Sequence, residues 1–473
     1  MSNSKQGLFV TPDGKNVVFT FILVTSLFLL WGFCNGMIDV MDKHFQEELG
    51  LSKSQSAWVQ FAHYLGYFLM SVPAGWLATR LGYKGGIIAG LLLVAVGGFW
   101  FIPATHINDL VHTGTVSPNT AFVAFLTGVC VIATGLTFLE TIANPYTTVL
   151  GDLRYAATRI NLAQSCNGIG WILGPIVGSM YFYSKDAMGR STGSQTLYIP
   201  YVGIAVGVTL LAVVFYFARV PDIKMEDDYH LDDSVTTASH SIWSHPHFVF
   251  AVFAQFFNIA AQAGIFSFFI NYMTSEVPAI PASWNETMTR LAEHSGFLRD
   301  WLLGWFEVNK QGVLTISNKG ASNLASLGFV LFLIGRLTGA GLLRRFSAHK
   351  ILGLYAVISA VATFVVFLKV GWISVLCVFL SYFSMSITFP TIFALGIFGL
   401  GARAKKASAF IVMGIMGGAV LPKLMGYVAD KYDMSRGFIV PMFCFLFVAF
   451  YGFNWSRFSK AESLHAVRAT SGH

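Results

Sequence analysis

Residues 17–40 read VVFTFILVTSLFLLWGFCNGMIDV, an apolar run whose single charged side chain, Asp39, stands one residue before its end. A helix needs about 20 apolar residues to cross the hydrocarbon core of a bilayer. The run follows Lys5 and Lys15. It is longer than the apolar core of about 7–15 residues that a secretory signal peptide carries. It therefore predicts a retained first membrane span.

The composition of the whole chain agrees with this interpretation. Of 473 residues, 55% are hydrophobic and only 11% are charged, whereas a soluble domain has about 25% charged residues. So few charges cannot cover a water-facing surface of this size. The net charge of +7 does not indicate a nucleic-acid partner, because the basic residues lie in short loops between apolar runs.

Apolar runs recur along the chain and predict an all-α membrane protein with twelve transmembrane helices. The predicted spans are 17–41, 55–79, 86–104, 119–150, 159–183, 197–219, 247–274, 321–343, 351–369, 371–401, 407–429 and 437–456. An acidic, polar segment divides six spans from six. We therefore expect an N-terminal half at 1–217, a cytoplasmic linker at 218–246 and a C-terminal half at 247–473.

Positive charge predicts the orientation, because cytoplasmic loops are enriched in Lys and Arg. Alternate loops carry the basic residues Arg80, Lys84, Arg154, Arg159, Arg344, Arg345, Lys350, Arg403, Lys405 and Lys406. Both termini are then cytoplasmic, and we expect a bacterial inner-membrane location. A weak internal repeat agrees with two parallel halves: Gly170 and Pro175 in the fifth span have the spacing of Gly417 and Pro422 in the eleventh.

The predicted loop at 275–319 lies on the extracytoplasmic side. Its apolar residues fall on one face at helical spacing and predict an amphipathic helix on the membrane surface, or a lid over the vestibule. They are Phe297, Leu298, Trp301, Leu302, Trp305 and Phe306. The cysteines are predicted to be small buried apolar residues without a disulfide or metal role, because none has ligand spacing. They are Cys34, Cys130, Cys166, Cys377 and Cys444.

Two carboxylates stand inside predicted spans, where ionisable residues are costly and are candidates for function. Glu140 lies near the middle of the fourth span, so it should face a cavity, and desolvation there favours its protonated form. Asp39 lies nearer the outer end of the first span and can exchange protons with the outside more readily. Both are candidate proton carriers. A hydrogen-bonded buried carboxylate at Glu140 and an interfacial cap at Asp39 are the structural alternatives.

Amides and aromatic side chains form a second group of candidates. Asn161, Gln164 and Asn167 share one face of the fifth span, and Gln255, Asn258 and Gln262 repeat at helical spacing in the seventh, with Asn271 beyond. Such groups suit sugar hydroxyls and CH faces, or they hold helices together. His63 is a proton relay, a sugar contact or a buried neutral histidine. Lys423 is predicted to extend toward the interface and Arg336 to be structural.

Several stretches resemble the fucose–proton symporter family of the major facilitator superfamily. They are LETIANP at 139–145, NLAQSCN at 161–167, Gly335-Arg336 and FPTIF at 389–393. The resemblance implies alternating access, proton handling by Asp39 and Glu140, and a sugar site lined by Gln164 and Asn167. Asn35, Asn144 and Phe389 are assigned to the same site by their positions in these motifs and in the first span.

Departures from the family pattern leave the sugar open. Gly36 and Ile38 replace amides, Phe389 replaces a tyrosine, and His63 and Lys423 are unexpected. L-fucose is the preferred substrate, with glucose, galactose or N-acetylglucosamine as alternatives, and an uncoupled facilitator as the rival mechanism. No HExxH or clustered metal ligands indicate an enzyme. We expect no cofactor, no metal, no nucleic acid, and a monomer in the lipid bilayer.

Overall fold

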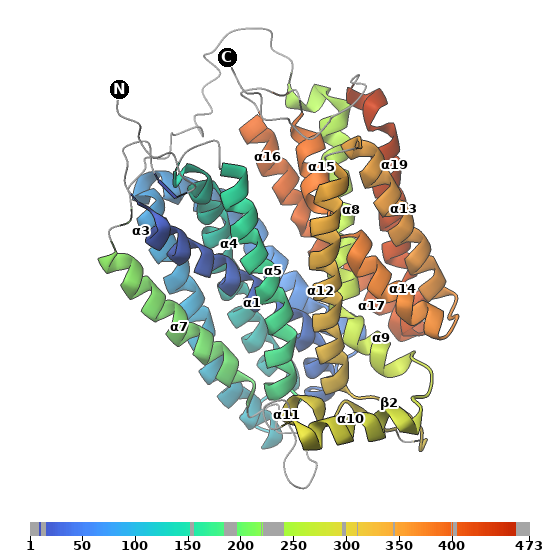
Figure 1. Cartoon of the computed structure of the whole chain (residues 1–473). Coiled ribbons are helices and arrows are strands. Elements are labelled where there is room, and N and C mark those ends of the chain that lie inside the picture. The colour runs from blue at the N-terminus through green and yellow to red at the C-terminus, as the bar shows by residue number, and fades with distance from the viewer. Residues whose placement is uncertain are drawn as a thin grey trace, which may run out of the picture.

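The computed structural model describes residues 9–10, 16–151, 156–183, 196–218, 220, 241–295, 299–309, 311–343, 346–398, 400 and 404–459. Helices make up almost all of this part of the chain (Figure 1). Most of the predicted linker at 218–246 lies outside the described residues, as do Arg154, Arg344, Arg345 and Arg403.

The N-terminal part of the bundle is blue to green in Figure 1. Its elements are α1 (Val18–Glu48), α2 (Lys53–Ser56), α3 (Trp58–His112), α4 (Pro118–Val149), α5 (Ala156–Tyr181) and α7 (Tyr198–Phe217). Helix α3 contains both the second and the third predicted spans. Gly82 separates them with a φ of 68°. Glycine adopts this conformation without a steric penalty.

The C-terminal part contains several interrupted helices. Its elements are η2 (Ile242–Ser244), α8 (Pro246–Ser267), α9 (Phe269–Ser275), α12 (Asn318–Leu343), α13 (Ala348–Phe367), α14 (Trp372–Ser384), α15 (Thr388–Ile397), α16 (Ala404–Met413), η4 (Gly414–Met416), α17 (Gly417–Lys431), α18 (Met434–Gly437) and α19 (Ile439–Ser459). Pro390 is the third residue of α15, and a proline is tolerated in the first turn of a helix because its missing N–H has no partner there.

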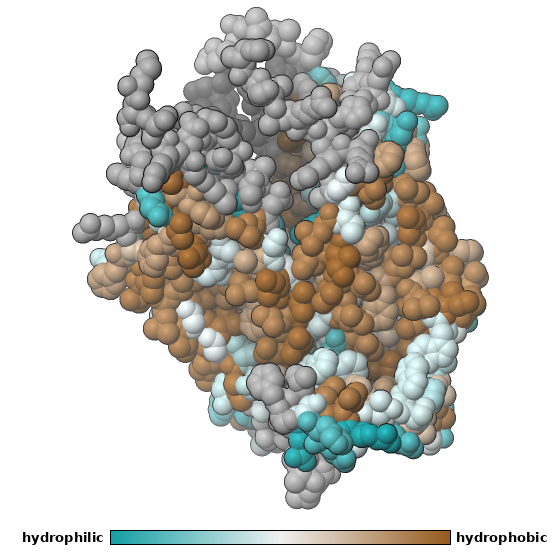
Figure 2. Space-filling model, viewed as in Figure 1, coloured by the Kyte–Doolittle hydropathy of each residue, from teal (hydrophilic) through white to brown (hydrophobic). Residues whose placement is uncertain are grey.

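Ten segments of the described chain are long and apolar enough to cross a membrane. The first part of α3 and the whole of α5 complete the twelve predicted spans but fall below that apolar threshold. Polar residues account for this, since Gln60 and His63 stand in the first and Gln164 and Asn167 in the second. Figure 2 shows apolar side chains as a broad band around the middle of the molecule, as a bilayer requires.

Helix α1 extends beyond its predicted end at residue 41 and finishes at Glu48. The predicted boundary is wrong because the polar residues from Asp42 onward indicate a loop when the sequence is considered alone. In the structure Asp42 is buried within the helix, and Gln46 one turn later bonds to Asn271 of α9. Polar partners on another helix thus allow a polar helical turn to be buried.

The segment between α9 and α12 is folded differently from the prediction. Its main helix is α10 (Ala282–His294), followed by α11 (Arg299–Leu302) and an antiparallel hairpin of β1 (Phe306–Val308) and β2 (Leu314–Ile316). Of the predicted helix around 297–306 the structure has the short α11, which ends at Leu302 before the β1 strand, and Phe297 and Leu298 lie outside the described residues. Trp284 of α10 contacts Trp372 at the start of α14, with ring centroids 5.3 Å apart. Helix α10 lies across one end of the bundle (Figure 1), here called the α10 end.

The repeated glycines have matching roles in the two parts of the bundle. A Cβ atom on Gly170 would lie 2.2 Å from the backbone oxygen of Leu29, and one on Gly417 would lie 1.9 Å from that of Phe256. Glycine therefore permits the close crossing of α5 on α1 and the corresponding crossing of α17 on α8. The weak sequence repeat corresponds to a repeated helix contact.

Candidate functional site

The buried carboxylate of Asp39 is held by one amide from α3. The side chain is 6% exposed, and its Oδ1 accepts a hydrogen bond from Gln60 Nε2 at 3.0 Å. Its Oδ2 has no partner within the described chain. The predicted interfacial cap at Asp39 does not fit this position, because α1 continues well beyond it, to Glu48.

Asp42 is a second buried carboxylate, which sequence reasoning missed. It stands three residues after Asp39 on α1 and is 0% exposed. Its Oδ2 accepts from Ser267 Oγ of α8 and, at 3.5 Å, from the same Gln60 Nε2 that serves Asp39. The spacing of three residues would have placed both carboxylates on one helix face, had the span been extended beyond residue 41.

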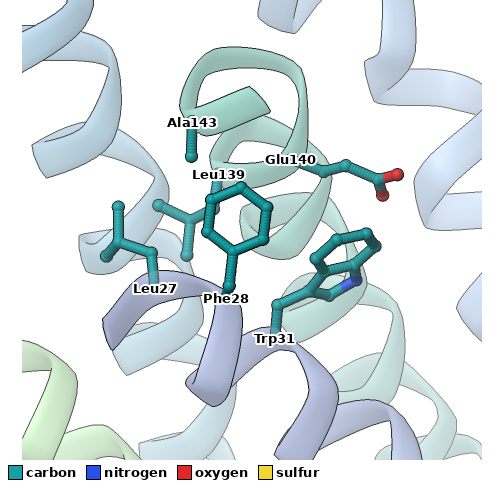
Figure 3. Close-up of a pocket in the computed structure, with 6 residues that line it drawn as sticks. All are labelled: Leu27, Phe28, Trp31, Leu139, Glu140 and Ala143. Atoms are coloured by element: carbon teal, nitrogen blue, oxygen red, sulfur yellow. The ribbon is translucent and has the colours of Figure 1, made fainter. Parts of the chain in front are cut away.

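Glu140 of α4 lies at the edge of a small cavity (Figure 3). The apolar wall consists of Leu27, Phe28, Leu139 and Ala143, and the Glu140 carboxylate points away from that wall, beside the Trp31 indole. Trp31 Nε1 donates a hydrogen bond of 2.7 Å to the Tyr67 hydroxyl on α3. Glu140 is partly exposed rather than sealed by protein.

One face of α3 joins these two regions. Gln60, His63, Tyr64 and Tyr67 repeat at intervals of three or four residues, so they share a helix face. The buried His63 ring lies 5.1 Å from the Tyr64 ring and 5.0 Å from the Tyr67 ring. Its Nδ1 has no hydrogen-bond partner in the described residues. The polar face therefore runs from Asp39 at one end to the Trp31–Tyr67 pair beside Glu140 at the other.

The amides of α4 and α5 make two kinds of contact: some bond to each other beside Glu140, and one bonds to the backbone of a neighbouring helix. Asn144 Nδ2 donates to the backbone oxygen of Glu140 at 3.0 Å, and Asn144 Oδ1 accepts from Gln164 Nε2 at 3.1 Å. The buried Asn167 instead donates to the backbone oxygen of Phe28 at 3.1 Å and ties α5 to α1. The side chain of Asn161 lies outside the described residues.

Three predicted amides of α8 are fully or almost fully buried. Both polar atoms of Gln255 lack a partner in the described chain, and so does Asn258 Nδ2. Gln262 Nε2 donates to Met385 O and to Thr388 Oγ1, both at 3.1 Å, where α14 gives way to α15. Phe389 follows directly and is half-buried on α15. Gln262 therefore supports the helix break, while within the described chain Gln255 keeps a donor and an acceptor available and Asn258 keeps its Nδ2 donor.

The groups of α1 and α3 lie near those of α14. Tyr64 is within electrostatic range of Asp39, Asp42 and Glu140, and Tyr382 of α14 is within range of Asp39. The Tyr382 hydroxyl and Asn35 Oδ1 have no partner in the described part of the chain. The interior thus presents carboxylates, amides, a histidine and aromatic rings in one region.

Contacts between the two parts of the bundle gather at the α10 end. Asp430 of α17 accepts backbone hydrogen bonds from Lys53 at 2.9 Å and Ser54 at 2.8 Å. Asn318 of α12 donates to Glu47 at 2.6 Å. The Lys423 ammonium lies 3.7 Å from the centre of the Trp58 ring, so it makes a contact across the bundle instead of extending to the interface. These contacts hold the α10 end closed.

Arg336 of α12 has the structural surroundings that were predicted. Its Nε donates to Ser386 O at 3.4 Å, and its guanidinium lies over the Phe332 ring. All five cysteines are free thiols, and Cys34 and Cys444 are buried.

Comparison with known proteins defines the class. The family model of the Major Facilitator Superfamily matches residues 17–368, and the chain belongs to that superfamily. Within it, the chain is 32% identical to the L-fucose-proton symporter of Escherichia coli strain K12, over 92% of each chain. This similarity confirms the resemblance to the fucose–proton symporter family. A glucose/galactose transporter of Brucella abortus is 29% identical, over 93% of this chain and 95% of that protein.

Solved structures agree with the assignment. The chain is similar to a crystal structure of the transporter FucP in the outward conformation, with a TM-score of 0.62 and 31% identity over 93% of this chain and 99% of that one. A D-xylose-proton symporter gives a TM-score of 0.67 at 13% identity, over 94% of this chain and 99% of that one. The second likeness concerns the fold alone.

Proposed function

We propose that this chain is a proton-coupled symporter that imports a hexose by alternating access. The observation that carries this proposal is the pairing of buried, uncompensated carboxylates with amide, histidine and tyrosine atoms that lack protein partners in the described interior. A hydroxyl-rich ligand with apolar faces would satisfy those atoms. L-fucose is the first candidate, and glucose or galactose follow from the names of the similar proteins.

The setting of this function follows from the distribution of charge. Basic residues such as Arg80 and Lys84 flank the Gly82 break of α3, between the second and third predicted spans, and Lys84 Nζ donates to Ala218 O directly after α7. The positive-inside tendency then puts both termini in the cytoplasm and the α10 end outside a bacterial inner membrane. The protein moves its substrates across the membrane and is not an enzyme. It works as a monomer in the bilayer and needs neither a cofactor nor a metal.

Asp39 and Glu140 have separate roles in the proposed cycle. With the α10 end open, Asp39 is within reach of external water and takes up a proton. Sugar then binds against Gln164, Gln255 and Asn258, and its apolar face packs on the aromatic rings. Closure is favoured once the carboxylates are neutral, because burial of an unpaired charge is costly. Glu140 changes its protonation as the opposite end opens and sugar leaves.

The other predicted sugar-site residues fall into two groups, those that would contact the sugar and those that hold helices in place. Asn144 presents Gln164 through their mutual hydrogen bond, and Asn35 on α1 and His63 on α3 offer atoms that have no partner among the described residues. Asn167 and Gln262 serve chiefly to hold helices in place, through the backbone bonds that they make. Phe389 supplies an apolar contact beside Thr388.

The energy that one proton releases on crossing the membrane potential is large enough to concentrate the sugar inside the cell. Moving one proton charge through about 100 mV supplies about 2.3 kcal/mol. At about 1.4 kcal/mol per tenfold, this sustains roughly fifty-fold accumulation of sugar. A pH gradient adds to that figure.

The test uses purified protein in proteoliposomes that contain a pH-sensitive dye. L-fucose, D-glucose, D-galactose and N-acetylglucosamine are added in turn, and proton entry and labelled-sugar entry are recorded together. We expect one of these sugars to carry protons inward and to accumulate under an imposed pH gradient. Asp39→Asn and Glu140→Gln should each lose accumulation. Sugar entry that equilibrates without proton movement would instead identify an uncoupled facilitator.

A further inference from the structure

Asp42 has no role in the mechanism described above, although its surroundings are unusual for an aspartate. It lies on α1 one turn closer to the α10 end than Asp39 and is fully buried. Its Oδ1 has no hydrogen-bond partner in the described chain, while its Oδ2 faces Ser267 of α8. A solvated loop residue, which the sequence predicted, would show none of these properties.

The two aspartates share a single donor group. Gln60 Nε2 lies 3.0 Å from Asp39 Oδ1 and 3.5 Å from Asp42 Oδ2, so its two N–H groups can serve one carboxyl each. Asp39 and Asp42 are therefore neighbours as well as members of one helix face.

The charges around Asp42 do not compensate it. Among the described residues, the titratable groups within electrostatic range include Asp39 on α1, Tyr64 on α3, Tyr183 after α5 and Tyr201 on α7. On α8, the facing group is the neutral Ser267 hydroxyl. No Lys, Arg or His nitrogen of the described residues lies within 4.0 Å of Asp39 or Asp42. Two adjacent buried carboxylates without a cation cannot both remain ionised, so at least one proton accompanies them.

The Ser267 contact links that proton to the conformation. Asp42 and Ser267 belong to the two parts of the bundle, which must separate if the α10 end is to open. Separation would hydrate Asp42 and favour its carboxylate form, whereas closure desolvates it and favours the carboxylic acid. The contact of α1 with α8 at Asp42 and Ser267 is here called the seam. A carboxylate at the seam thus takes one proton from external water as the seam closes, without any other reactant.

We propose that Asp42 is a second proton-binding carboxylate of the transport cycle, through which closure of α1 against α8 is coupled to external pH. The proton adds to a carboxylate oxygen of Asp42 at the open α10 end. It then stays on the Asp42–Asp39 pair while the seam is closed. This inference rests on the proposed proton-coupled function.

The test compares Asp42→Asn with the unaltered protein in the same proteoliposomes, using whichever of the four sugars the unaltered protein accumulates. Sugar exchange at equal pH on both sides should stay within about twofold, because asparagine preserves the shape and accepts from Ser267. Accumulation driven by a pH gradient should fall from tens of fold to near unity, and uptake should lose its dependence on external pH. Asp42→Glu, which restores an ionisable group, should recover part of both.

Ser267→Ala is the matched control, because it removes the cross-bundle hydrogen bond and leaves the carboxylate. It should change the transport rate but retain the dependence on external pH. The inference is overturned if Asp42→Asn accumulates sugar with the unaltered pH profile, or if Asp42→Asn and Ser267→Ala behave alike. If Asp42→Asn does not fold, an unaltered pH profile in Asp42→Glu overturns the inference and a shifted profile supports it. A lack of proton coupling in the unaltered protein would instead refute the proposed function itself.

Discussion

Replacement of Asp430 by alanine should open the α10 end. In the closed structure its two carboxylate oxygens accept the backbone N–H groups of Lys53 and Ser54 at 2.9 Å and 2.8 Å. The Lys53 ammonium adds a weaker ion pair at 3.8 Å. All three contacts join α17 to the segment between α1 and α3, so an opened α10 end cannot keep them.

The size of the effect follows from these contacts. A hydrogen bond to a charged group contributes about 1.5–3 kcal/mol when it is sheltered from water. The Asp430 side chain is 26% exposed, which places each bond at the lower end or below it. The exposed ion pair adds less than about 1 kcal/mol. A total of about 2–3 kcal/mol corresponds to a shift of about 30- to 150-fold in the ratio of closed to open molecules.

Distance measurements between spin labels would detect this shift. Labels at the exposed positions Thr115 and Glu286 lie on the two parts of the bundle near the α10 end, and the native cysteines would first be replaced. Asp430→Ala should populate a longer distance that is minor in the unaltered protein, and Asp430→Asn should fall between the two. Asp109→Ala removes an exposed carboxylate near the same end and is the matched control. Unchanged distances in Asp430→Ala would refute the inference that Asp430 holds the α10 end closed.

Four further predictions concern folding and stability. Gly417→Ala should lower the thermal unfolding temperature in detergent by several degrees or abolish folding, because its Cβ would meet backbone 1.9 Å away, whereas Gly203→Ala has open space and should be neutral. Lys369 has a φ of 58°, so Lys369→Gly should destabilise less than Lys369→Ala in the same melts. Partial burial opposes the charge of Lys369, but its ion pairs outweigh burial and raise its pKa. The ion pairs of Lys369 therefore contribute fully to stability below the ordinary lysine pKa. That contribution is lost as pH rises through the higher pKa that Lys369 has in the folded protein. Trp31→Phe loses the 2.7 Å bond to Tyr67. That loss should lower the free energy of unfolding by about 1 kcal/mol and the unfolding temperature in the same melts, and an unchanged melt would show that the bond does not stabilise the fold.

Hydropathy predicts the helices well because burial in lipid depends on composition over a whole span. The α3 break at Gly82 also follows from local chemistry, since the turn needs a residue that tolerates positive φ. The end of α1 could not be predicted in this way. Whether Asp42 and Gln46 are solvated or buried depends on Ser267 and Asn271, which come from the other part of the bundle and lie far away in the sequence.

The candidate site shows the same division between local and distant causes. Glu140 is recognisable from the sequence because a carboxylate in the middle of an apolar span needs a special environment. The roles of the amides are not recognisable in this way. Gln164 and Asn167 share a face of α5, yet one bonds to a side chain near Glu140 and the other to the backbone of α1. The packing of α5 against α4 and α1 decides which partner each amide meets, and the sequence alone does not show that packing.

Two opposing free energies give a physical reason for alternating access: the cost of polar atoms buried without partners in the interior, and the stabilisation from the bonds that close the α10 end. Polar atoms without a partner in the described residues, such as Gln255 Nε2, Asn35 Oδ1 and Asp39 Oδ2, make the closed interior costly. The cost is about 1–3 kcal/mol for each atom that stays dry. The charge-assisted bonds at Asp430 and Glu47 offset part of that cost. A sugar that satisfies the interior atoms removes the remainder, so it favours closure at whichever end was open. Protons on the buried carboxylates act in the same direction, and the two ligands therefore promote each other's transport.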